Sequence, residues 1–458
     1  MKDCIVVGAG VSGLVTAREL VRRGHAVTVL EAQDRVGGRT LSVSFDGRRL
    51  DIGGQWIGPR QKHIAELVRE LGLGTFPQHH AGSKLLARGE DTFRYGGVFA
   101  LPRVSPWAML DLFVARRRLH RGLARLDPRR PWASPDARAW DAITLEAWMN
   151  ENVRTKDARF LLSNIARAVL AAEPDEVSFL FFLDFLRRGG TLDETAGIAG
   201  GAQETRIIEG MQTVSERMAS ALPEPVHLGE PVRAIRQRDR AVEVVTDRET
   251  YAGRFVAISV PPALAARIDY SVPLGRERQR LMDQLPMGSV IKFLVQYETP
   301  FWRQAGLSGE AASDRGTILM TMDATSSDGG VAALVAFSLG TSGRHWAKRT
   351  ADERKRAVLA ELAHLFGPKA ARPVRFEEKV WVDDPWSGGC YCAVPGPGAL
   401  TAFGDALRAT CGRIHWAGCE TAFQWPGVDG AVESGKRAAQ EVHARLAIER
   451  SHTTEVRA

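Results

Sequence analysis

A glycine-rich turn near the start of the chain carries the clearest chemistry in the sequence. Gly8, Gly10 and Gly13 follow an apolar segment directly, and apolar residues then recur at helical spacing as far as Gly24. Three glycines in this pattern permit a tight turn, a close approach of the backbone to a pyrophosphate, and close packing of helix on strand. The amino end of that helix, with Ser12 in the turn, can then face phosphate groups. The pattern predicts dinucleotide binding.

An acidic residue follows at the distance expected for a ribose contact. Residues 4–7 and 26–30 are predicted strands on either side of the helix, and Glu31 ends the second of them, 18 positions after Gly13. A carboxylate at this place accepts hydrogen bonds from an adenosine ribose without a 2′-phosphate. FAD and NAD both stay open at this point.

A second pair of glycines distinguishes the two cofactors. Arg35, Gly37, Gly38 and Arg39 follow soon after Glu31. The glycines permit a second close approach of the backbone to the cofactor, and the arginines offer a cation to the diphosphate. Because an NAD enzyme does not need this arrangement, the predicted cofactor is FAD.

Two later segments carry further candidate groups. Lys292 lies within the strand-like apolar run 290–295, where an ammonium group is costly unless it is hydrated or paired. A lysine that reaches solvent from a strand edge is the alternative. Gly427 and Val428 precede a predicted helix start at 431–438, whose free N–H groups can face an anion such as reduced flavin. An ordinary helix cap is the alternative there.

These motifs resemble the flavin-containing amine oxidases, whose signature joins the glycine-rich fingerprint to an E-x-x-x-R-x-G-G-R run. The resemblance continues in the same order over nearly the whole chain, and it is greatest to monoamine oxidases, including the soluble bacterial type. It rests on further segments at 51–59, 200–204, 288–293, 300–302, 387–391, 417–421 and 425–427.

The resemblance implies a reaction. An amine loses the equivalent of a hydride from its α-carbon to flavin N5 and leaves as an imine, which water hydrolyses to an aldehyde or ketone. Dioxygen reoxidises the flavin and becomes hydrogen peroxide. The resemblance also implies the two predicted catalytic residues: Lys292 holds a water at N5, and Tyr391 forms one wall of an aromatic cage around the amine.

The chain departs from the family pattern at the second wall of that cage. Val428 stands where the relatives have an aromatic residue, which predicts a wider or reshaped pocket, and Gln203 matches a substrate-side glutamine. Aromatic residues that could compensate are Trp386, Phe423 and Trp425. Cys390 stands where some monoamine oxidases attach the flavin through a thioether, so covalent attachment of FAD through Cys390 stays open.

The predicted contacts form two groups. The substrate contacts are Gln203, Tyr391 and Val428. The cofactor contacts are Gly8, Gly10, Ser12, Gly13, Glu31, Arg35, Gly37, Gly38, Arg39, Gly54, Gln55, Trp56, Val232, Cys390, Gly418, Glu420, Gly427 and Val428. No metal site is predicted, because the histidines and cysteines form no ligand pattern.

The length of 458 residues requires more than one core, and a composition of 44% hydrophobic and 25% charged residues excludes disorder, collagen and coiled coil. The predicted fold class is α/β: an FAD-binding Rossmann-like domain with a βαβ dinucleotide-binding unit, interleaved with a mixed-sheet plus helical substrate domain. The FAD domain is predicted at 1–80, 205–290 and 385–450, and the substrate domain at 81–204 and 291–384. A polar tail is predicted at 451–458.

The net charge of +7 includes one dense basic stretch, 116–130, where Leu119, Leu123 and Leu126 indicate an amphipathic helix with a solvated basic face. No nucleic-acid motif accompanies it and no segment is long and apolar enough to span a membrane. The expected partners are therefore a small-molecule amine and dioxygen, with neither nucleic acid nor membrane, and a homodimer stays open. Five cysteines without a CxxC pair fit a reducing cytoplasm.

Other functions share the amino-terminal fingerprint. An L-amino-acid oxidase needs a cation for the substrate carboxylate, for which Arg206 and Arg94 are candidates. A flavin desaturase is a second alternative. A non-catalytic flavin-binding interaction protein is a third, with the basic helix as its surface.

Overall fold

The glycine-rich turn joins the first strand and the first helix of a βαβ unit. The structure is a computed structural model that describes residues 1–96, 105–423 and 427–455. β1 (Lys2–Val7) and β2 (Val27–Glu31) pair in parallel, and α1 (Val11–Arg22) connects them. Leu14, Ala17 and Leu20 of α1 are buried in the core. This unit confirms the Rossmann-like part of the predicted fold class.

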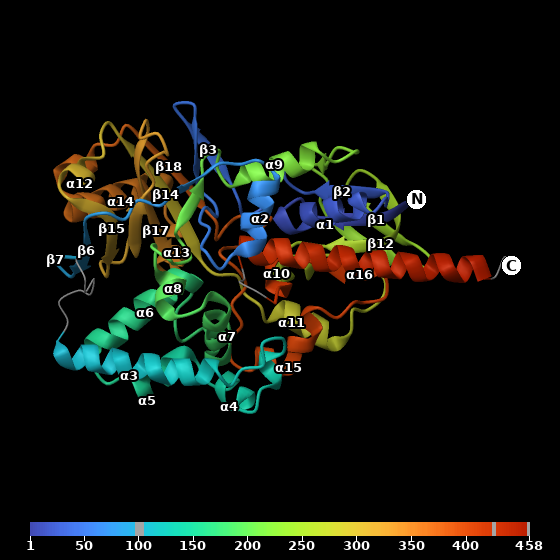
Figure 1. Cartoon of the computed structure of the whole chain (residues 1–458), viewed down its shortest axis with the longest axis horizontal. Coiled ribbons are helices and arrows are strands. Elements are labelled where there is room, and N and C mark those ends of the chain that lie inside the picture. The colour runs from blue at the N-terminus through green and yellow to red at the C-terminus, as the bar shows by residue number, and fades with distance from the viewer. Residues whose placement is uncertain (97–104, 424–426, 456–458) are drawn as a thin grey trace.

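The βαβ unit belongs to an eight-stranded sheet, which we call the first sheet. Its order is β13-β10-β11-β12-β1-β2-β9, with β19 paired to β12. The long helix α16 (Val428–Glu455) packs along α1 and α2 (Lys62–Glu70), as Figure 1 shows. The remaining strands are β9 (His227–Leu228), β10 (Val232–Gln237), β11 (Val242–Thr246), β12 (Thr250–Ile258), β13 (Asp269–Tyr270) and β19 (Ile414–Trp416).

A second, mixed sheet has seven strands in the order β18-β14-β17-β16-β15-β6-β7. Only β6 and β15 pair in parallel, and β14 and β17 are buried along their whole length. Helix α14 (Ala351–Phe366) packs its buried apolar residues into the same core. The strands are β6 (Ser83–Arg88), β7 (Asp91–Tyr95), β14 (Val290–Tyr297), β15 (Leu307–Ser313), β16 (Met320–Asp323), β17 (Ala332–Leu339) and β18 (Arg375–Val380).

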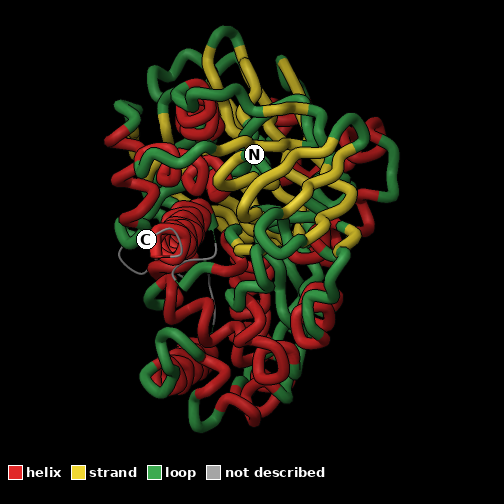
Figure 2. The backbone as a smooth tube through the Cα atoms, turned by 90° about the vertical axis from the view of Figure 1, so that its right-hand side faces the viewer, coloured by secondary structure: helices red, strands yellow, loops and turns green. Residues whose placement is uncertain are grey.

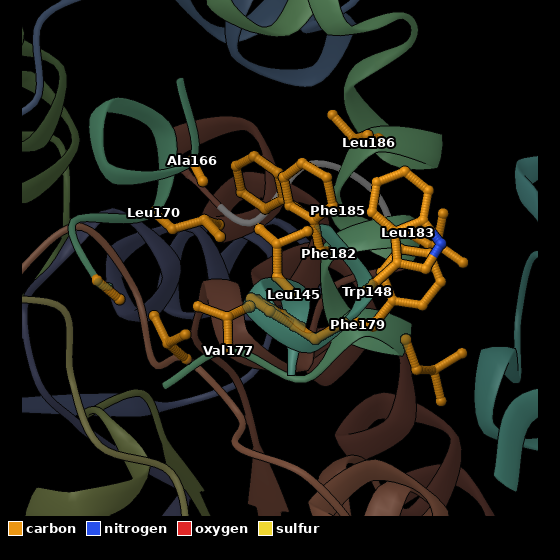
Figure 3. Close-up of a cluster of buried hydrophobic side chains, with 14 of the residues drawn as sticks. Leu145, Trp148, Ala166, Leu170, Val177, Phe179, Phe182, Leu183, Phe185 and Leu186 are labelled. Atoms are coloured by element: carbon orange, nitrogen blue, oxygen red, sulfur yellow. The ribbon is translucent and has the colours of Figure 1, made fainter. Parts of the chain in front are cut away.

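A layer of helices packs around a third core, and Figure 2 shows it apart from the strands, in the lower half of the molecule. Trp148 stacks on Phe179 with ring centroids 4.9 Å apart, and Phe182 and Leu145 lie beside them in Figure 3. Leucine is the most frequent residue of this core, and the large buried aromatic side chains add much apolar area. Its helices are α3 (Pro106–Leu123), α4 (Ala137–Asp141), α5 (Leu145–Asn152), α6 (Lys156–Leu170), α7 (Phe179–Gly189) and α8 (Leu192–Ala196).

Short elements connect these layers. Two small sheets are formed by β3 (Ser42–Phe45) with β4 (Arg48–Asp51) and by β5 (Thr75–Pro77) with β8 (Thr205–Ile207). The remaining helices are α9 (Gln212–Ser220), α10 (Pro262–Ala265), α11 (Arg276–Asp283), α12 (Phe301–Gln304), α13 (Gly340–Ala347) and α15 (Ala399–Phe403).

The structure differs from the sequence predictions at two helix ends. The basic helix ends at Leu123, short of 130, because Pro128 and Pro131 follow closely. The last helix continues through Glu455, although a polar tail is predicted from 451, because no glycine or proline interrupts 443–455. The division into domains at the predicted boundaries stays a prediction. Within the described part of the chain, no helix has both the length and the apolar character to cross a membrane.

Candidate active site

A cavity opens at the carboxyl ends of β1 and β2. Parallel sheets bind dinucleotides at this edge. The walls come from the turn before α1, the end of β2, the loop after β12 and the start of α16. Predicted cofactor residues that line it are Gly8, Gly10, Ser12, Glu31, Gly37, Gly38, Arg39, Gly54, Val232, Cys390, Gly427 and Val428.

Glycine occupies the three positions of the turn for different structural reasons. A Cβ on Gly13 would lie 1.9 Å from the carbonyl oxygen of Gly8, so the close packing of α1 requires glycine there. Gly8 has φ +99°, which favours glycine. A Cβ on Gly10 would meet no protein atom nearer than Gly38 Cα at 4.0 Å. Gly10 therefore keeps space in the cavity free, as a pyrophosphate requires.

Glu31 is a hydrogen-bond acceptor in the wall of this cavity. Its Oε2 accepts a hydrogen bond from the Ala9 N–H at 2.7 Å and its Oε1 accepts one from the Gln33 N–H at 2.9 Å. Burial raises the pKa of Glu31, whereas these two hydrogen bonds lower it. Each carboxylate oxygen has a further lone pair, so the group fits a ribose diol.

The two arginines of the signature run have separate environments. Arg39 lines the cavity and forms a double hydrogen bond with the buried Glu420, at 2.6 Å and 3.2 Å. Burial acts to raise the pKa of Glu420, but the opposing effect of Arg39 is larger. The pKa of Glu420 therefore lies below its usual value. Arg35 donates to the carbonyl groups of Val36, Gly38 and Thr40. It holds the loop in shape and is not among the cavity-lining residues.

Lys292 is buried in the middle of β14, with 2% of its surface exposed. Its Nζ donates to the Gly53 carbonyl at 2.8 Å and to Gln55 Oε1. Burial lowers its pKa from 10.5 to about 7, with Asp51 acting to raise it and Arg206 to lower it further. The lysine therefore titrates near neutral pH and does not reach solvent from a strand edge.

A second cavity meets the first one at Gly54, Cys390, Tyr391, Gly427 and Val428. We call it the substrate cavity. Lys292, Gln55, Trp56 and Gln203 also line it, so Gln55 and Trp56 lie on this side rather than in the first cavity. Its remaining apolar and aromatic walls are Ala168, Val169, Phe185, Ala196, Ala202, Val290, Met320, Met322, Phe337 and Trp381.

The structure places the three predicted substrate residues together in this cavity. Within the described part of the chain, the Tyr391 hydroxyl and Gln203 Oε1 are buried without a hydrogen-bond partner. Gln203 Nε2 donates to the Thr195 carbonyl at 3.3 Å. Val428 is the first residue of α16 and lies against Gly54. A Cβ placed on Gly54 would be 3.6 Å from Cγ2 of Val428. The cavity wall therefore contains the large side chain of Tyr391 and the small side chain of Val428.

Cys390 lies at the junction of the two cavities and is buried. Burial raises the pKa of its thiol to about 12, although Arg39 and Lys292 act to lower it. Cys392 lines only the substrate cavity. Of the two cysteines, Cys390 is thus the one in the wall that both cavities share.

Several sequence candidates lie away from the substrate cavity. Arg206 is buried over the Phe76 ring and donates to the Thr325 carbonyl at 2.5 Å, and Arg94 donates to the Gly306 carbonyl. Trp386 lines the first cavity, and the ring of Phe423 lies beneath Arg408. Gly418 and Glu420 lie behind Arg39, and Trp425 is outside the described residues. The aromatic walls that the sequence reasoning missed are Phe185, Phe337 and Trp381.

Comparison with known proteins identifies the family to which a chain with this site belongs. Residues 11–443 match the family model described as flavin containing amine oxidoreductase. The chain belongs to this family. A probable flavin-containing monoamine oxidase A of Dictyostelium discoideum is 40% identical, with 97% of this chain and 98% of the relative covered. An L-amino acid dehydrogenase of Synechocystis is 36% identical over 96% of this chain and 94% of the relative.

Solved structures agree with the family. Cyclohexylamine oxidase from Brevibacterium oxydans has a TM-score of 0.92 at 31% identity, covering 97% of this chain and 99% of that chain. A putrescine oxidase bound to putrescine has a TM-score of 0.90 at 32% identity, with the same coverage.

The comparisons confirm the predicted function and cofactor. The protein is an FAD-dependent oxidoreductase that converts an amine to an imine and reduces dioxygen to hydrogen peroxide. The glycine turn, Glu31 and the loop held by Arg35 fit FAD, which accepts the electrons when bound.

Proposed function

We propose that this amine oxidase acts on apolar monoamines that carry no second charged group. The observation that supports the proposal is the lining of the substrate cavity. Among the described residues that line it, Lys292 is the only one with a basic or acidic side chain, and the other walls are mainly aliphatic and aromatic. Apolar walls of this kind favour a hydrocarbon substituent.

A second charge on the substrate would be poorly solvated in such a cavity. The distal ammonium group of a diamine needs a carboxylate or water, and burial without either is costly. The carboxylate of an amino acid needs a cation, and the Lys292 ammonium already donates to Gly53 and Gln55. Arg206 and Arg94 are engaged elsewhere, so neither supplies that cation.

The proposed roles of the site residues follow from their positions. Tyr391 packs beside the amine, Gln203 accepts a hydrogen bond from it, and Lys292 holds a water next to flavin N5. Val428 leaves room for a branched or cyclic substituent where an aromatic side chain would narrow the cavity. The substrate amine must bind neutral, because its nitrogen lone pair assists loss of the hydride.

A substrate panel tests this proposal. We expect kcat/KM for cyclohexylamine and benzylamine to exceed that for putrescine and L-leucine by at least about tenfold, as one lost or unpaired charge contact would produce. Met320 lies in the cavity wall, so Met320→Glu should increase turnover of putrescine, and the isosteric Met320→Gln serves as the uncharged control. A wild-type preference for putrescine or L-leucine would overturn the proposal.

We further propose that the enzyme works in the cytoplasm. All five cysteines are free thiols, and four of them are buried. Reduced cysteines are typical of proteins that stay in a reducing compartment. Fractionation of cells that produce the protein at native level tests this, and recovery from a secreted fraction would contradict it.

A further inference from the structure

The outer side of α3 exposes large apolar residues in an unusual concentration. Trp107 is 74% exposed, Leu110 is 53% exposed and Phe113 is 55% exposed. Together with Arg117 and Arg121 they form what we call the α3 outer face. Figure 1 shows α3 along the lower edge of the molecule, beneath α6.

Helical spacing explains why these residues share one side. Steps of three or four residues return to the same face of a helix. The opposite side of α3 packs on α6 and α7, where Ala108, Ala115 and Leu119 are buried. The apolar residues of the outer face therefore have no role in the core. A single exposed apolar residue is ordinary on a protein surface, but three along one helix face are not.

The charges on this face are also unbalanced. The guanidinium of Arg117 lies 5.9 Å from the centre of the Phe113 ring, and within the described residues neither Arg117 nor Arg121 forms an ion pair. Their neighbours differ: Arg116 pairs with Asp193, and Arg118 donates to Asn152. His120 is the other titratable group exposed beside them. The face is thus cationic as well as apolar.

We propose that the α3 outer face docks on the surface of a lipid bilayer with anionic headgroups. Interfacial helices combine tryptophan, phenylalanine and leucine, which enter the boundary between headgroups and acyl chains, with arginines that meet anionic lipids. A second copy of this chain fits less well, because it carries the same formal net charge of +7, whereas anionic headgroups attract that charge. The inference is independent of the substrate proposed above.

Two helices connect the α3 outer face with the substrate cavity. Helices α6 and α7, on which α3 packs, supply Ala168, Val169 and Phe185 to the cavity wall. Neutral apolar amines concentrate in bilayers, so the helical layer would face a reservoir of substrate. The binding is peripheral and needs no spanning helix.

Sedimentation with vesicles tests the proposal on the FAD-loaded protein. We expect binding to vesicles of phosphatidylcholine and phosphatidylserine in a 7:3 ratio, weaker binding to phosphatidylcholine alone, and weakening by salt. Arg117→Glu/Arg121→Glu and Trp107→Ser/Leu110→Ser/Phe113→Ser should each reduce binding at least about tenfold. The matched control is Arg276→Glu/Arg280→Glu, an exposed pair at the same spacing on α11, which should bind like wild type.

Amine oxidation in solution should be unchanged in all three variants, which shows that each is folded. Wild-type protein that ignores the anionic vesicles would overturn the proposal. So would an Arg117→Glu/Arg121→Glu variant that binds as well as the control pair. Loss of self-association in the serine variant, without any vesicle binding by wild type, would assign the face to a dimer and also overturn it.

Discussion

Replacing Lys292 by methionine separates the stability of the site from its chemistry. The substitution keeps an unbranched side chain of similar length and removes the ammonium group of a residue that is 2% exposed within β14. We expect Lys292→Met to make the FAD-loaded protein more stable at pH 7, and to slow the reaction of reduced flavin with dioxygen.

The magnitude follows from the environment of the lysine. Burial lowers the pKa of Lys292 from 10.5 to about 7, which corresponds to about 5 kcal/mol of destabilisation at neutral pH. Methionine removes this destabilisation but leaves the Gly53 carbonyl and Gln55 Oε1 without their hydrogen-bond donor. Each unpaired acceptor lowers the free energy of unfolding by about 1–2 kcal/mol. The net gain in free energy of unfolding is therefore about 1–3 kcal/mol.

The pH dependence gives this prediction a definite sign. Between about pH 7 and 10.5 the unfolded chain holds the lysine proton and the folded chain does not. Wild-type stability consequently rises with pH relative to the variant, by about 1.4 kcal/mol for each pH unit. Thermal unfolding between pH 7 and 9, with excess FAD present, measures whether the advantage of the variant disappears.

Rapid mixing measures the chemical half of the prediction. Mixing with amine under anaerobic conditions gives the rate of flavin reduction, and mixing reduced enzyme with dioxygen gives the rate of reoxidation. We expect reoxidation to fall at least about a hundredfold, the lower end of the range for a lost proton-transfer group, and reduction to change far less. Equal slowing of both steps, or a variant less stable than wild type at pH 7, would refute the reasoning.

Three further predictions concern the cofactor and the cavity. Gly10→Ala should fold normally but lower the affinity for FAD at least about tenfold, measured by equilibrium dialysis. Gly13→Ala should destabilise the fold itself, because of the two added Cβ atoms only the one at position 13 clashes with the backbone. If both variants fold alike and bind FAD alike, the roles given to the two glycines are wrong. Val428→Tyr should lower KM for benzylamine and raise it for bulkier amines, and an unchanged profile would mean that Val428 does not limit the substrate. Acid precipitation should leave yellow colour in the protein pellet if Cys390 binds the flavin, and Cys390→Ala should release it; full release from wild type excludes the bond.

The amino-terminal part of the first cavity could be predicted because its signals are local. The glycines, Glu31 and the loop at 35–39 act through backbone conformation and short-range spacing, so a run of about forty residues contains them all. Arg35 shows the limit of that reasoning. The sequence suggests a cation for the diphosphate, but its side chain donates to three nearby carbonyl groups.

The substrate half could be predicted only at the residues that match family motifs. Val169, Phe337 and Trp381 lie on separate elements and have the same character as ordinary core residues, so nothing in the local pattern marks them as cavity walls. The sequence also does not predict that Trp107 and Phe113 are exposed, because apolar residues at helical spacing normally indicate a buried face.

Anaerobic titration with a simple monoamine tests the central claim most directly. In the absence of oxygen, cyclohexylamine should bleach the absorbance of the bound FAD completely at one equivalent, and admission of air should restore the colour with formation of hydrogen peroxide. Bleaching by L-leucine or putrescine but not by cyclohexylamine or benzylamine would contradict the proposed substrate class. An oxidised spectrum that no amine changes would contradict amine oxidation by this site.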